Sequence, residues 1–127
     1  MEFVLFIKVS PKEVEIRGPK EAKIGDKIVL TCTSTVSYPK ADILWYKGGL
    51  SHEPMATTFR SSSDGGQISV SNVTFVIEPD DMTVVVTCQS INRKLGEFAI
   101  GTHTINVFRK FTTLCKQKYL CECVAVV

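Results

Sequence analysis

The sequence predicts an all-β protein, folded as a two-sheet antiparallel β-sandwich with Greek-key connections. Short runs with an apolar residue at every second position are separated by turn-forming residues along most of the chain. Two of these runs carry Cys32 and Cys88, and a third carries the single tryptophan, Trp45. Because alternate residues of a strand share a face, these three side chains can point into one core. The length of 127 residues fits one such domain with short extensions at both ends.

Each predicted strand follows from alternation and from the residues that interrupt it. The first run alternates at Val14 and Ile16, and Pro19 limits it, which is typical of an edge strand. In the third run Trp45 points inward, so its neighbours Leu44 and Tyr46 point outward. The expected strands, in chain order, lie at residues 11–17, 28–32, 42–47, 52–60, 67–77, 84–89 and 98–107.

Turn-forming residues separate these strands. The separators are Gly25-Asp26, a loop at 34–41, Gly48-Gly49, Ser61 to Gly66, Glu78 to Asp81, and Asn92 to Gly96. The run at 67–77 contains a conflict, because Ile68 and Val70 have the opposite parity to Val73 and Phe75. We expect a β-bulge or a change of register near Ser71 to reconcile them.

Three segments resemble an immunoglobulin superfamily domain. Leu30-Thr31-Cys32 and the run at 42–47 resemble its strands B and C, and residues 81–89 resemble its E–F turn and strand F. Residues 37–41 and 87–90 are similar to C2-type domains of nephrin-like and nectin-like adhesion receptors. The resemblance implies a Cys32–Cys88 disulfide with Trp45 packed on it, and therefore an oxidising compartment.

One position departs from the superfamily pattern. Val86 stands where many members have a tyrosine whose hydroxyl binds the chain upstream. We therefore expect packing and Asp81 to hold the E–F corner.

The domain is expected at residues 11–108, between an N-terminal extension at 1–10 and a C-terminal tail at 109–127 that is irregular or weakly ordered. The tail contains Cys115, Cys121 and Cys123, whose pairing is left open and whose spacing matches no zinc site. The apolar run at 3–7 is too short for a signal peptide, and no stretch is long enough to span a membrane. We expect a piece of a longer receptor on the extracellular side of the plasma membrane.

Composition argues against several other classes. A net charge of +2 gives no reason to expect binding to nucleic acid. His52 and His103 lie beside no nucleophile or carboxylate pattern of an enzyme, and Asp80-Asp81 fits a structural turn better than a calcium site. We therefore expect no enzymatic activity, no cofactor and no metal.

What remains is recognition of proteins. In the adhesion receptors that this chain resembles, contact is made by the sheet that contains strands C, F and G. The outward residues expected on that face are Leu44, Tyr46, Val85, Thr87 and Gln89. The expected partner is another immunoglobulin-type receptor, homophilic or heterophilic, although strand C′ or a neighbouring domain of the same receptor could cover this face instead. The alternative function is an intracellular structural domain of a filament-associated protein, with its cysteines reduced.

One modification is also expected. Asn72-Val73-Thr74 is a sequon for N-linked glycosylation. Because Val73 is expected to point inward, Asn72 should point to solvent, which would make the protein a glycoprotein.

Overall fold

Two facing β-sheets make up the main body of the protein. The computed structural model describes residues 9–63, 65–108, 110–117 and 120–126. All the elements of regular secondary structure assigned within these residues are β-strands. The strands are β1 (Val14–Arg17), β2 (Glu21–Lys23), β3 (Lys27–Ser34), β4 (Asp42–Lys47), β5 (Leu50–His52), β6 (Ala56–Ser61), β7 (Gln67–Val76), β8 (Thr83–Asn92), β9 (Glu97–Phe108), β10 (Lys110–Gln117) and β11 (Leu120–Val126).

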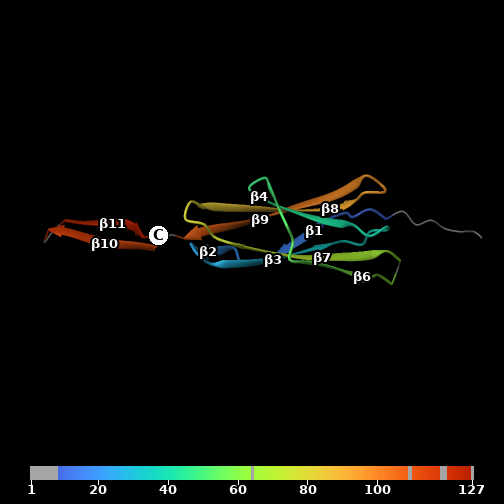
Figure 1. Ribbon diagram of the computed structural model, residues 1–127, viewed down its shortest axis with the longest axis horizontal. Helices are drawn as coiled ribbons and strands as arrows, with labels where there is room; N and C mark the ends of the chain where they lie inside the picture. The colour runs from blue at the N-terminus through green and yellow to red at the C-terminus, as the bar shows by residue number, and fades with distance from the viewer. Residues whose placement is uncertain (1–8, 64, 109, 118–119, 127) are drawn as a thin grey trace, which may run out of the picture.

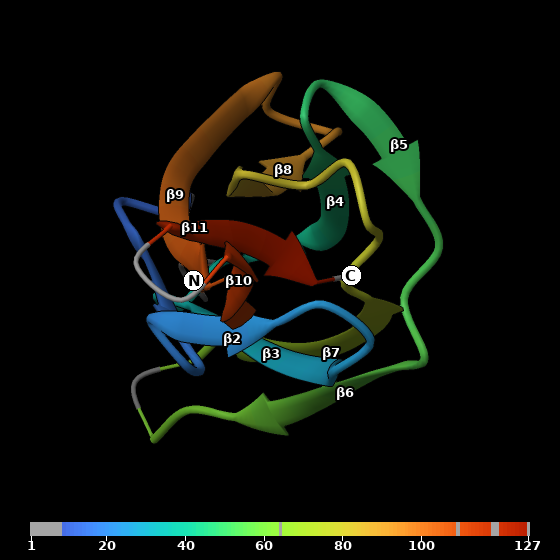
Figure 2. The ribbon, with the colours of Figure 1, turned by 90° about the vertical axis from the view of Figure 1, so that its left-hand side faces the viewer.

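The sheets have the strand orders β1-β3-β7-β6 and β2-β9-β8-β4-β5. Figure 1 shows them edge-on as two layers, and Figure 2 looks along the strands from one end. Consecutive strands such as β3 and β4 lie in different sheets, so the chain crosses between the layers as a Greek key does. The predicted two-sheet, all-β sandwich is confirmed. One detail differs, because β2 pairs parallel with β9 and the five-stranded sheet is therefore mixed.

The first strand of the sandwich is split between the two sheets, which the alternation pattern did not predict. β1 pairs with β3, and after residues 18–20 the chain continues as β2 beside β9. The crossing passes directly over the core, because a Cβ added to Gly18 would overlap the side chain of Leu30. Glycine at this position therefore lets the backbone approach the core closely enough to change sheets.

The expected single strand at 52–60 is also two strands. β5 extends the five-stranded sheet beside β4, whereas β6 lies at the edge of the other sheet beside β7. Pro54 stands between them and has no N–H to donate to a continuing ladder, so the chain leaves one sheet there before it joins the next.

The bulge expected near Ser71 is absent, and that prediction is wrong. β7 pairs with β3 and with β6 without a shift in register. Ser69 and Ser71 occupy the inward positions and are fully buried. Trp45 Nε1 donates to Ser71 Oγ over 2.9 Å, and Ser69 Oγ donates to the Ala41 carbonyl over 2.7 Å. Hydrogen-bonded serines thus fill inward positions that hydropathy alone would give to apolar residues.

The core lies between the two sheets and is closed by a disulfide. Cys32 of β3 is bonded to Cys88 of β8, so the bridge joins the four-stranded sheet to the five-stranded one. Trp45 is the Cα partner of Cys88 on the neighbouring strand and is 1% exposed. The apolar residues buried around them are Ala22, Ile28, Leu30, Ile43, Val73, Phe75, Ile77, Val84, Val86 and Ile105.

The C-terminal tail contains a hairpin where an irregular segment was expected. β10 and β11 pair antiparallel, and Figure 1 shows this pair beyond the end of the sandwich. The tail is rich in threonine, valine and aromatic residues, which favour extended chains. Cys115 and Cys121 are Cα partners in this ladder, but the side chains of the three tail cysteines lie outside the described residues. Most of the N-terminal extension also lies outside them, although Val9 forms a bridge with Tyr38.

Candidate functional site

Strand β8 organises the candidate binding face, because it lies at the centre of the five-stranded sheet between β9 and β4. Its residues alternate regularly: Val84, Val86 and Cys88 are buried against the other sheet. The residues between them therefore point to the opposite, outer side of the same strand. We call the outer side of β4, β8 and β9 the β4–β8–β9 face.

The five residues expected on this face all lie there, on two neighbouring strands. Leu44 is the Cα partner of Gln89, and Tyr46 is the partner of Thr87. These four are half-buried, whereas Val85 is 41% exposed. The structure therefore brings the predicted residues together, although most of them are less accessible than an open strand face would allow.

The most exposed apolar residues of the face were missed by the sequence analysis. Phe98 and Ile100 of β9 are 56% and 58% exposed. Ile100 is the partner of Gln89, and Phe98 is the partner of Ile91. The signal was present in the sequence, since Ala99 and Ile105 are the inward residues of this strand and fix the opposite parity for Phe98 and Ile100.

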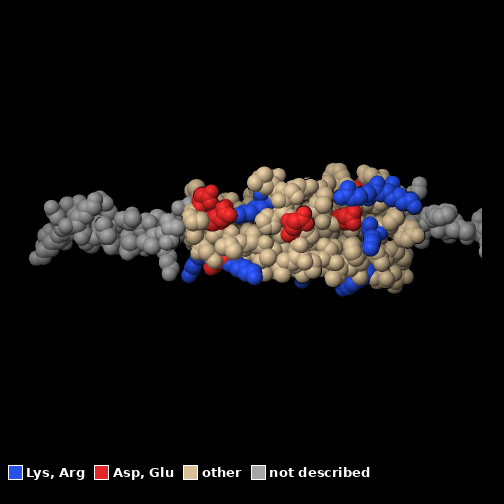
Figure 3. Space-filling model, in the orientation of Figure 1, with Lys and Arg blue, Asp and Glu red and all other residues tan. Residues whose placement is uncertain are grey.

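The middle of the β4–β8–β9 face carries no lysine, arginine, aspartate, glutamate or histidine. Beyond Ile100, the outward positions of β9 are Thr102, Thr104, Asn106 and the last residue, Phe108, which is 52% exposed. Charge begins near the turn between β8 and β9, where Arg93 Nε donates to Asp42 Oδ2 over 2.9 Å. On the edge of the sandwich that Figure 3 presents, charged side chains form small separate groups with larger uncharged areas between them.

Strand β5 does not cover this face. It pairs with the last three residues of β4 and extends the sheet sideways, with Lys47 opposite Leu50. Leu50 is 76% exposed, and Val85 remains accessible beside it. The covering by C′ that the sequence left open is therefore absent at Val85.

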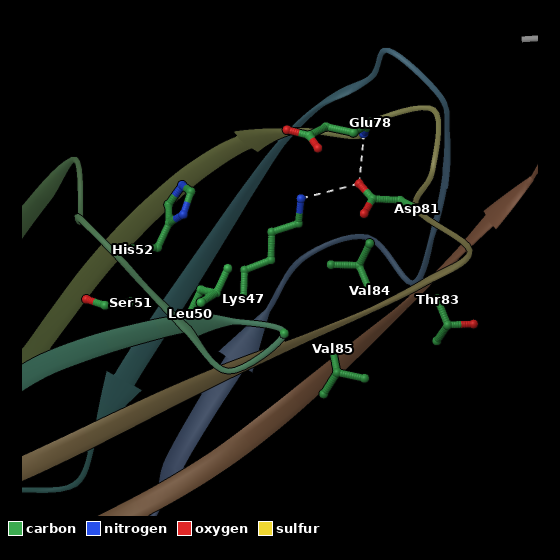
Figure 4. Close-up of a pocket in the computed structure, with 10 residues that line it drawn as sticks. Lys47, Leu50, Ser51, His52, Glu78, Asp81, Thr83, Val84 and Val85 are labelled. Atoms are coloured by element: carbon green, nitrogen blue, oxygen red, sulfur yellow. Dashed lines mark hydrogen bonds and ion pairs between the residues drawn. The ribbon is translucent and has the colours of Figure 1, made fainter.

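A cavity of about 430 Å³ lies beside the face, between the β4–β5 hairpin and the E–F corner (Figure 4). Lys47 Nζ lies 3.3 Å from Asp81 Oδ2, and the same carboxylate oxygen accepts the Glu78 N–H over 2.8 Å. Lys47 Nζ also lies 5.1 Å from the centre of the Phe75 ring. The charges of Lys47 and Asp81 therefore pair with each other. Asp81 also holds the E–F corner, as expected from the presence of Val86 in place of the tyrosine.

The two histidines have structural contacts. His52 meets the Phe75 ring edge-on, with 6.1 Å between the ring centres, and His103 Nε2 lies 2.8 Å from the Pro19 carbonyl oxygen. Within the described ranges, no group of three or more histidine, cysteine or acidic residues is placed to hold a metal ion. No helix in that part of the chain is long and apolar enough to cross a membrane.

Asn72 lies on the other side of the molecule. Its neighbours along β7, Ser71 and Val73, are buried in the core, so Asn72 faces outward from the four-stranded sheet and is half-buried there. The sequon and the β4–β8–β9 face therefore occupy opposite surfaces of the sandwich.

Two sheets joined by Cys32–Cys88, with Trp45 packed against the bridge, define an immunoglobulin-like domain. Val85, Phe98 and Ile100 are exposed apolar residues on the outer face of β4, β8 and β9 in this domain. The chain belongs to the family of CD80-like C2-set immunoglobulin domains, whose family model matches residues 7–97. The resemblance found in the sequence is thereby confirmed.

Among known proteins, the chain is similar to nephrin and to a cell adhesion molecule. It is 28% identical over 88 residues to human nephrin, which covers 69% of this chain and 7% of nephrin. It is 31% identical over 105 residues to cell adhesion molecule 3 of Xenopus laevis, covering 80% of this chain and 27% of that protein. The chain therefore spans less than a third of the length of either relative.

Solved structures show the same fold at lower identity. The ectodomain of mouse nectin-like molecule 4 superposes with a TM-score of 0.72 at 17% identity, covering 94% of this chain and 46% of that one. Rst D1-D2 gives a TM-score of 0.68 at 18% identity, covering 80% and 51%. Bovine butyrophilin gives 0.63 at 20% identity, covering 75% and 43%.

Proposed function

We propose that this chain is an extracellular immunoglobulin-like domain of a cell-surface adhesion or recognition receptor. The domain unit spans residues 11–108 and contacts other proteins through the β4–β8–β9 face. The observation that carries the proposal is the uncharged middle of that face, with Phe98 and Ile100 exposed on β9 and Val85, the partner of Thr104, exposed further along the paired strand β8. The similarity to nephrin and to cell adhesion molecule 3 supports the adhesion class. No enzymatic activity forms part of the proposal.

The chemistry of the face suits a protein partner. Phe98 and Ile100 are 56% and 58% exposed, so removing what remains of each side chain from water would contribute about 1–1.5 kcal/mol, roughly half the value for full burial. The neighbouring hydroxyl groups of Thr87, Thr102 and Thr104 can exchange hydrogen bonds with a partner at little cost. Since the middle of the face has no charge, it meets no repulsion from a second immunoglobulin-type face, whether of a second copy or of a different receptor.

The disulfide supports the extracellular part of the proposal. Cys32 and Cys88 are fully buried and bonded to each other, and such bonds persist in oxidising compartments. The alternative filament-associated domain would carry two reduced thiols at these positions. Mass spectrometry of protein isolated from its native source under non-reducing conditions separates the two, because the proposal requires the linked cysteines.

The face is tested by placing a charge on it. Ile100→Asp should abolish clustering of beads densely coated with the domain, and the parent should associate in solution only weakly, with a Kd of about a micromolar or poorer. Val29→Asp is the matched control, because Val29 is 49% exposed on the outer side of the other sheet. Bead clustering that is the same for the parent and Ile100→Asp, or that is absent for both, would remove this face as the site.

A further inference from the structure

The sequon at Asn72 has a defined geometry in the folded domain. Asn72 lies in the central strand of the four-stranded sheet, opposite Thr31 on one side and Ala56 on the other. Thr31 Oγ1 donates a hydrogen bond of 2.7 Å to Asn72 Oδ1. The amide oxygen is therefore directed toward β3, which leaves the amide nitrogen on the other side of the planar group.

The third residue of the sequon has an unusual hydroxyl. Thr74 Oγ1 is buried and has no hydrogen-bond partner among the residues that the structure describes. A buried hydroxyl without a partner loses its hydrogen bonds to water and gains none in return, which destabilises the fold. Valine has nearly the same shape and lacks this disadvantage. Folding stability therefore gives no reason for a hydroxyl at residue 74.

We propose that Asn72 carries an N-linked glycan and that the hydroxyl of Thr74 is retained for the transfer of that glycan. The donor is an oligosaccharide joined to a lipid through a diphosphate. The Asn72 amide nitrogen forms a bond with C1 of the first sugar, the bond between C1 and the diphosphate oxygen breaks, and the amide nitrogen gives one proton to the surrounding water. The lipid diphosphate leaves with the electron pair. This inference rests on the proposed function, because a chain meets that donor when it enters the secretory pathway.

The structure also assigns an order to glycan transfer and to the pairing of β7 with β3. In the folded domain the Thr74 hydroxyl is buried, and the Asn72 carbonyl accepts the Met55 N–H over 2.8 Å. β7 is moreover paired on both sides at Asn72. A transferase must reach the Asn72 amide and the Thr74 hydroxyl together on an accessible segment. Glycan transfer therefore precedes the pairing of β7 with β3.

The position of the glycan has a consequence for recognition. Val29, the Cα partner of Thr74, is 49% exposed, and Val76 on the same side of β7 is 52% exposed. A glycan on Asn72 lies next to these apolar side chains and shields the outer side of the four-stranded sheet. The β4–β8–β9 face, on the opposite surface, stays bare for a protein partner.

The sequon is tested with variants of the full chain, exported from eukaryotic cells by a supplied signal peptide. The parent and Thr74→Ser should carry sugar at Asn72 that a peptide N-glycosidase removes, whereas Thr74→Val and Asn72→Gln should carry none. Thr74→Val made in bacteria and oxidised should melt at the same temperature as the bacterial parent or higher. A Thr74→Val protein that melts well below it would show that the hydroxyl is structural and would overturn its assigned role.

Two outcomes separate this inference from the proposed function. A parent chain that is secreted with the Cys32–Cys88 bond but without sugar overturns the glycan and leaves the receptor proposal standing. A glycosylated parent whose clustering is unchanged by Ile100→Asp overturns the binding face and leaves the glycan standing.

The order of events is tested with a purified oligosaccharyltransferase and its lipid-linked donor. The reduced, unfolded chain should be modified at Asn72, and the folded, oxidised chain should be modified at least tenfold more slowly. Equal rates for the two forms would overturn the proposed order.

Discussion

Removing the hydroxyl of Ser71 should destabilise the domain by leaving the indole nitrogen of Trp45 without a partner. Trp45 Nε1 donates to Ser71 Oγ over 2.9 Å, and Thr57 Oγ1 forms a second hydrogen bond with the same oxygen over 3.1 Å. Trp45 is 1% exposed and Ser71 is fully buried, so water cannot replace the lost acceptor at the indole. Ser71→Ala therefore removes the acceptor and creates a buried, unpaired N–H.

The expected size follows from that loss. Leaving a buried donor unsatisfied costs about 1–3 kcal/mol of unfolding free energy. For a domain of this size, each 1 kcal/mol lowers the Tm by about 4–8 °C. Trp45→Phe removes the donor instead and leaves a small cavity, which has a cost of its own. In the double variant the indole N–H and the Ser71 hydroxyl are both absent, so no indole N–H is left unpaired. The double variant should therefore lose about 1 kcal/mol less unfolding free energy than the sum of the two single losses.

The measurement is urea-induced unfolding of the parent, both single variants and the double variant, followed by circular dichroism with the disulfide intact. Ser51→Ala is the control, because Ser51 is an exposed residue of the edge strand β5 and should change stability by less than about 0.5 kcal/mol. Strict additivity in the double variant, or a Ser71→Ala protein as stable as the control, would refute the argument that the indole depends on this bond.

Two further predictions concern the backbone. Gly18→Ala should lower the unfolding free energy by about 1–3 kcal/mol, because its new methyl group would overlap Leu30. Thermal melting checks this, with the variant Lys20→Ala at an exposed neighbouring position as the control. Equal melting temperatures for the two variants would mean that the chain can shift away from the core. Asp81→Ala should cost about 1–3 kcal/mol, because it removes the acceptor of the Glu78 N–H and the partner of Lys47. Hydrogen exchange should then rise locally at Glu78, and an unchanged exchange rate there would contradict the role given to the corner.

The sequence predicted most of the sandwich because alternation is a local property. Val85, Thr87 and Gln89 could be placed outward from the parity of Val84 and Cys88 alone. The same rule places Phe98 and Ile100 outward, although the predicted outward residues lay only on the strands that carry Trp45 and Cys88. Phe98 and Ile100 could therefore be predicted from the sequence.

The remaining differences depend on partners far away in the chain. Ser69 and Ser71 look misplaced by hydropathy, and only the positions of Ala41 and Trp45 in space explain why they can be buried. The split first strand depends on the close approach of Gly18 to Leu30. It also depends on the parallel pairing of β2 with β9, which lies far away in the sequence. Such contacts are set by the tertiary fold, so no pattern within a single run reveals them.

The parallel pairing of β2 with β9 has a mechanical consequence. The chain enters the sandwich through β1 and β2 and leaves it through β9, and Figure 1 shows the first described residues and the end of β9 at opposite ends. Tension applied between those ends therefore pulls β2 and β9 in opposite directions along their common axis. The backbone bonds between them, such as that from Asn106 N to Lys20 O, are loaded together in shear instead of opening one after another like a zipper. A domain that links two surfaces under load would thus resist extension at the seam where its first and last strands meet.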